Sequence, residues 1–112
     1  MPQIDFKSIL SQLGNGLTQL AQTNLKDYLN AAETDGKQIL NTLSADLQNW
    51  TTELANGSIT ASDLEYLVNA KKNLIEMSAL QQAGLAAIRL DQFKNDAIQL
   101  IIKTVVSIVK AL

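Results

Sequence analysis

The chain contains no cysteine and no histidine among its 112 residues. It therefore offers no disulfide, no thiolate or imidazole ligand for a metal, and no serine–histidine or cysteine–histidine pair for nucleophilic catalysis. No phosphate-binding glycine loop and no calcium-binding loop is present either. We therefore predict that the protein is not an enzyme and expect neither a cofactor nor a metal site. The lack of cysteine fits a reducing compartment, and we expect a cytoplasmic location.

Proline, aromatic residues and net charge are also scarce. The chain has one proline, 4% aromatic residues and a net charge of −2. Residues 1–56 hold three lysines and six acidic residues, whereas residues 57–112 hold six basic and five acidic residues. Neither half is basic enough to predict a nucleic-acid partner. The abundance of Leu, Ile, Ala, Asn and Gln is typical of a helical protein.

Long hydrophobic runs are absent as well. The most apolar segment spans residues 97–112, which is 16 residues, and it contains Lys103 and Lys110. A membrane-spanning helix needs about 20 mostly apolar residues, so no transmembrane segment is predicted. The first residues lack the basic and apolar parts of a signal peptide, and none is expected.

The clearest local signal is a helix start at residues 59–64. Thr60 and Asp63 have the spacing of a capping box, in which each side chain binds the other residue's backbone N–H. Ile59 and Leu64 have the spacing of a hydrophobic staple around the same cap. Gly57 precedes them and is typical of a helix end. The pattern predicts that one helix ends near residue 56 and that another begins at Ala61.

The N-terminal half carries helical spacing of apolar residues with two interruptions. We expect a first helix over Ile4–Ala32 and a second over Gly36–Ala55, because an Asp-Gly pair at residues 35–36 favours a turn. Gly14 and Gly16 weaken the first helix, but the apolar spacing keeps its phase across them, which favours a continuous helix. Alternatively, the two helices join through Gly36 into one long rod.

In the C-terminal half, the apolar face changes direction near residues 81–84, which indicates a bend or break. We expect helices over Ala61–Gln81 and Gly84–Ala111. The whole chain, residues 1–112, is then a single all-α domain, an antiparallel bundle of about four helices. The alternative is a long helical hairpin that dimerises to bury its apolar faces.

The last segment has an apolar arc wider than a two-helix contact needs. The favoured interpretation is a central helix covered on several sides by its own chain, and the alternatives are a homo-oligomer seam or a membrane-surface helix. The candidate interaction face consists of Ile98, Ile101, Ile102, Val105, Ile108, Val109 and Leu112.

From this face we expect a non-catalytic helical interaction or structural module that binds a second copy of itself or another helical protein. The alternative is a peripheral membrane or lipid-binding protein. The membrane surface is the less favoured partner, because lysine is sparse in this segment and residues 97–112 contain no tryptophan or phenylalanine to anchor in a lipid interface.

Overall fold

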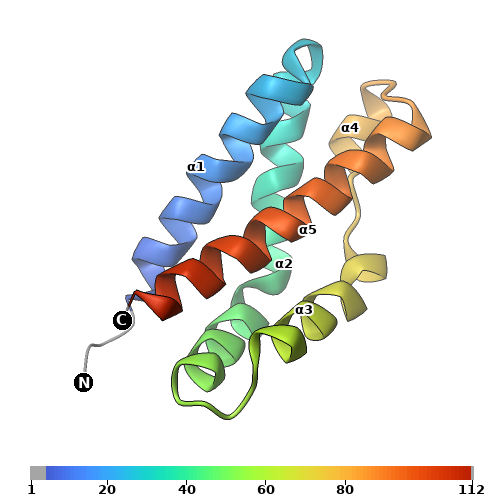
Figure 1. Cartoon of the computed structure of the whole chain (residues 1–112). Coiled ribbons are helices and arrows are strands. Elements are labelled where there is room, and N and C mark those ends of the chain that lie inside the picture. The colour runs from blue at the N-terminus through green and yellow to red at the C-terminus, as the bar shows by residue number, and fades with distance from the viewer. Residues whose placement is uncertain (1–4, 112) are drawn as a thin grey trace.

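The computed structural model describes residues 5–111, and these residues form packed helices without a β-strand (Figure 1). The α-helices are α1 (Phe6–Asn24), α2 (Leu29–Ala55), α3 (Ala61–Ala70), α4 (Ser78–Gln82) and α5 (Ala87–Lys110). Two 3-10 turns, η1 (Lys26–Tyr28) and η2 (Lys72–Leu74), lie between them. The predicted all-α class is confirmed, and the described residues form five α-helices where about four were expected.

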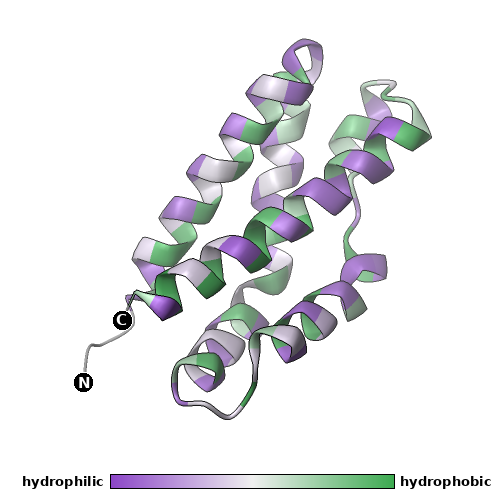
Figure 2. Ribbon diagram, viewed as in Figure 1, coloured by the Kyte–Doolittle hydropathy of each residue, from purple (hydrophilic) through white to green (hydrophobic). Residues whose placement is uncertain are grey.

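Helix α5 occupies the centre of the packing. Helices α1 and α2 run in opposite directions as a hairpin, and α5 crosses this hairpin with its C-terminal end beside the start of α1 (Figure 1). Helix α5 contacts each of the other four α-helices. Along α1 and α5, hydrophilic and hydrophobic residues alternate on the visible faces (Figure 2), as expected of amphipathic helices that bury one side.

Helix α1 is continuous through its two glycines, as predicted. A Cβ atom added at Gly16 would lie 3.0 Å from Leu100 Cδ2 of α5, whereas one added at Gly14 would meet nothing within 4 Å. Gly16 therefore lets α5 approach the backbone of α1 closely, and Gly14 faces open space. The expected start of this helix at Ile4 lies outside the described residues.

The predicted break at residues 33–36 is wrong. The chain instead leaves the helix at Leu25 and η1, and α2 runs unbroken through Asp35 and Gly36. Asp35 is buried, with 3% of its surface exposed, and its two carboxylate oxygens accept hydrogen bonds from the backbone N–H groups of Ala79 (3.1 Å) and Leu80 (2.7 Å). This contact with the start of α4 holds a turn-prone pair within a helix, so tertiary packing overrides local propensity.

The expected helix over Ala61–Gln81 is also wrong in its second half. Helix α3 ends at Ala70, and the chain continues through η2 to an extended residue, Ile75. Ile75 and Met77 are buried, so this irregular segment is held by its own apolar side chains.

Both boundary signals around α3 and α4 are confirmed. Thr60 N–H donates to Asp63 Oδ2 (2.9 Å) and Asp63 N–H donates to Thr60 Oγ1 (3.1 Å), which completes the capping box. The predicted break near residues 81–84 falls at Gly84, whose φ of 92° lies in the left-handed region that glycine adopts without strain. Helix α5 then begins at Ala87 rather than at Gly84.

We expect Gly14→Ala to raise the free energy of unfolding by about 0.5–1 kcal/mol, because glycine in a helix interior costs that much relative to alanine and the added methyl group meets no neighbour. Gly16→Ala should gain less or lose stability, since its methyl group presses on Leu100. Urea unfolding of the two variants measures the difference. Equal gains at both positions would contradict the close contact between α1 and α5.

Replacing Asp35 by alanine should lower the free energy of unfolding by about 1–3 kcal/mol, because two amide groups at the start of α4 lose their acceptor. Asp35→Asn keeps one acceptor oxygen, so its free energy of unfolding should lie between those of the unmodified protein and the alanine variant. In the alanine variant, amide hydrogen exchange should accelerate more at Ala79 and Leu80 than at other backbone amides. The matched control is Thr34→Ala, because the exposed Thr34 hydroxyl bonds only to the carbonyl of Asn30. An equal loss in this control would argue against the assigned role of Asp35.

Candidate functional site

The apolar face predicted on α5 is mostly covered by the chain itself. Ile98, Ile101, Ile102 and Val105 are buried in the core, which agrees with the interpretation of α5 as a central helix. The side chains of Ile108 and Val109 are half-buried and pack against the edge of this core. Leu112 lies outside the described residues. Four of the seven candidate residues are therefore not accessible to a partner in this structure.

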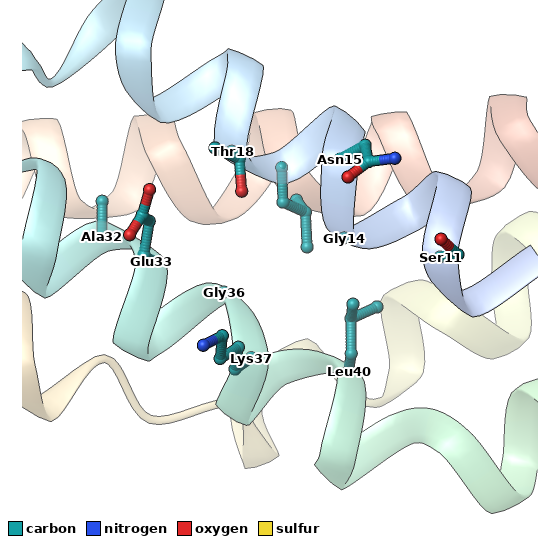
Figure 3. Close-up of a pocket in the computed structure, with 10 residues that line it drawn as sticks. Ser11, Gly14, Asn15, Thr18, Ala32, Glu33, Gly36, Lys37 and Leu40 are labelled. Carbon is teal, nitrogen blue, oxygen red and sulfur yellow. The ribbon is translucent and has the colours of Figure 1, made fainter.

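A groove lies on the other side of the α1–α2 hairpin. In Figure 3, α5 passes behind α1 and α2, so the groove opens on the side that α5 leaves uncovered. Its volume is about 410 Å³, and we refer to it as the α1–α2 groove. Its lining residues are Ser11, Gly14, Asn15, Leu17 and Thr18 from α1, and Ala32, Glu33, Gly36, Lys37 and Leu40 from α2.

Two glycines shape the floor of this groove. A Cβ atom at Gly14 would meet no neighbour within 4 Å, and one at Gly36 would meet only Leu17, at 3.7 Å from its Cβ. Gly36 and Leu17 are buried against each other, whereas Leu40 is half-buried and projects into the groove (Figure 3). The missing side chain at Gly14 leaves room for another molecule to approach the backbone of α1, and Leu40 offers it apolar contacts.

Polar groups from both helices line the groove. The Thr18 hydroxyl and the Glu33 carboxylate both point into the gap between α1 and α2 in Figure 3, and both residues are half-buried. Within residues 5–111, neither side chain forms a hydrogen bond, although the hydroxyls of Thr23 and Thr52 each donate to the carbonyl four residues earlier, at 3.0 Å. The polar groups in the groove are therefore available to water or to a bound partner.

Two opposite charges line the groove, Glu33 and Lys37. They stand four residues apart on α2, in the order that favours an ion pair within a helix. Within the described part of the chain neither forms an ion pair, and the pairs present there are Lys71–Asp46 (3.5 Å) and Lys72–Asp91 (3.9 Å). Both charges of the groove are thus unused by the fold.

Arg89, the single arginine, has a structural role instead. Its Nη2 atom donates to the carbonyl of Asn24 (3.0 Å), and its guanidinium carbon lies 5.9 Å from the centroid of the Tyr28 ring. A cation at this position interacts favourably with the exposed carbonyls at the C-terminal end of α1, and the ring adds a cation–π contact. Arg89 therefore ties the start of α5 to the end of α1.

Sequence reasoning did not find the groove. Apart from Leu17, its α1 wall consists of small residues at helical spacing beside the leucine stripe, and this spacing was the available signal. The α2 wall was obscured because a turn was expected at Asp35 and Gly36. The two walls become neighbours only when α2 continues through these residues.

Comparison with protein-family models, curated proteins and solved structures finds no match to this chain. Among residues 5–111, no group of three carboxylates is placed to hold a metal ion. None of the helices in this range combines the length and the apolar character needed to cross a membrane. We therefore infer function from the geometry of the groove and of the α5 face.

Val105→Asp should abolish cooperative folding or cost about 4 kcal/mol or more, because a carboxylate would replace a side chain with 0% exposure. Thermal unfolding followed by circular dichroism measures this loss. Ser107→Asp, at an exposed position on the same helix, is the matched control and should change stability little. A Val105→Asp protein of native stability and lower oligomeric mass would instead identify this face as an assembly seam.

Proposed function

We propose that the protein is a non-catalytic helical interaction module whose docking surface is the α1–α2 groove. The observation that supports this proposal is the glycine-floored groove on the side of the hairpin that α5 leaves uncovered. An amphipathic helix docks in such a groove by placing side chains of one face between two helices, with polar contacts along the rim. The proposed partner is a second copy of the chain or another helical protein, and the proposed compartment is the cytoplasm.

The shape of the groove favours a helix over a small molecule. The groove is bounded by two helices, and Ser11, Asn15 and Lys37 on its walls are exposed. Small-molecule sites usually bury about 70–90% of the surface of their ligand, which an open groove does not achieve. A docked helix needs less enclosure, because contacts along several turns add together.

Lipid binding through the α5 face has weaker support. Four of the seven residues on which it would rely are buried against other helices, so they would have to leave the core to enter a membrane. The apolar area they bury holds the helices together, and its transfer to lipid would require unfolding of the bundle.

Site-directed crosslinking tests the proposed docking surface. Because the chain has no cysteine, Asn15→Cys introduces a single thiol at the groove and Gln12→Cys introduces one at another exposed position of the same helix. Each variant is labelled with a benzophenone maleimide and irradiated in an extract of the cells that naturally produce the protein. We expect discrete protein adducts from position 15 and not from position 12.

A blocking variant makes this test specific. Adding Gly14→Leu places a side chain in the groove and should suppress the adducts, whereas adding Gln12→Leu to the Asn15→Cys protein should not. The mass of each adduct distinguishes a second copy of the chain from a different protein. Adducts that are equal at the two positions, or absent at both, would count against the groove as a docking surface.

A further inference from the structure

We infer that the occupant of the α1–α2 groove is the same face of a second copy, related by a two-fold axis that passes between the two α2 helices at the level midway between Glu33 and Lys37. This inference rests on the proposed function and specifies its partner. The groove carries one acid and one base, Glu33 and Lys37, on a single face of α2.

A two-fold axis at this level pairs the charges between copies. Residues 33 and 37 are about 6 Å apart along the helix, at 1.5 Å per residue. When two α2 helices lie antiparallel about an axis at the level of residue 35, Glu33 of one copy faces Lys37 of the second copy, and the reverse pair forms as well. Two ion pairs thus arise from side chains that form none within the described chain.

The mixed character of the groove favours a second copy over a different partner. A two-fold interface must be self-complementary, because the same residues appear on both sides. One acid and one base satisfy this condition, and Ser11, Asn15 and Thr18 can each donate and accept hydrogen bonds. An acidic or a basic helix would instead leave one of the two charges facing a like charge.

The floor of the groove permits the close approach that this arrangement needs. Gly14 has no side chain to block an approach to α1, and a Cβ atom added there would meet nothing within 4 Å. Two α1–α2 hairpins placed face to face form a four-helix arrangement, a common way for helical hairpins to bury their shared face. Leu40, which is half-buried in the single chain, would become covered in the dimer.

Charge reversal tests the inference, with molar mass measured by light scattering and Kd measured by sedimentation. The unmodified protein should dimerise, and dimerisation should weaken as salt is raised. Glu33→Lys and Lys37→Glu should each weaken dimerisation by about tenfold or more, because like charges then face each other. Mixing these two variants should restore a dimer that contains one copy of each, and the double variant should dimerise by itself.

A control variant distinguishes the proposed ion pairs from a general effect of net charge on dimerisation. Lys103→Glu changes the net charge as Lys37→Glu does, at an exposed position of α5, and should leave dimerisation unchanged. Circular dichroism shows whether each variant remains folded. If single reversals are tolerated, or if mixing them restores nothing, the two-fold inference is overturned.

A monomer at every concentration would also overturn this inference while leaving the proposed function open. The docking surface itself is judged separately, by whether Asn15→Cys yields adducts with a different protein. If Asn15→Cys yields no specific adducts and the protein is also a monomer, both the docking surface and the two-fold dimer are ruled out.

Discussion

The contact between the Asp35 carboxylate and the start of α4 determines how the two halves of the chain fit together. It joins residues that are 44 and 45 positions apart, and it supplies acceptors for two amide groups that a helix start leaves without intrahelical partners. The same contact keeps α2 helical through a turn-prone pair. Because α4 is fixed on α2, the chain returns at Leu85 in position to begin α5, and α5 then completes the core.

The helix signals that depend on neighbouring residues could be predicted from the sequence. The capping box of Thr60 and Asp63 and the continuity of α1 through Gly14 and Gly16 rest on contacts within a turn or two, and both were confirmed. The position of the first break could not be predicted. Asp35 looks like a turn residue until its partner, 44 residues later in the chain, is known, and Leu25 looks like one more apolar helix residue until it is buried at a turn.

The α5 face and the α1–α2 groove differ in whether the sequence reveals them. The wide apolar arc of α5 is visible in the sequence, and α5 as a whole contacts each of the other four α-helices. Its buried residues therefore report on the fold. The α1–α2 groove has no such pattern, because it consists of small and polar residues from two helices whose pairing is a tertiary property. A polar groove can serve recognition without a strong compositional signal, since interfaces are on average about as polar as other protein surface.

The contact of Gly16 with Leu100 has a consequence for how the protein folds during synthesis. It pairs the first helix with the last one, across more than two thirds of the chain. Contacts between distant residues require closure of a long loop, and they slow folding relative to local ones. On the ribosome, α1 and α2 emerge with a central apolar face still uncovered, and that face stays open until α5 has left the exit tunnel. The core therefore cannot close until α5 has emerged.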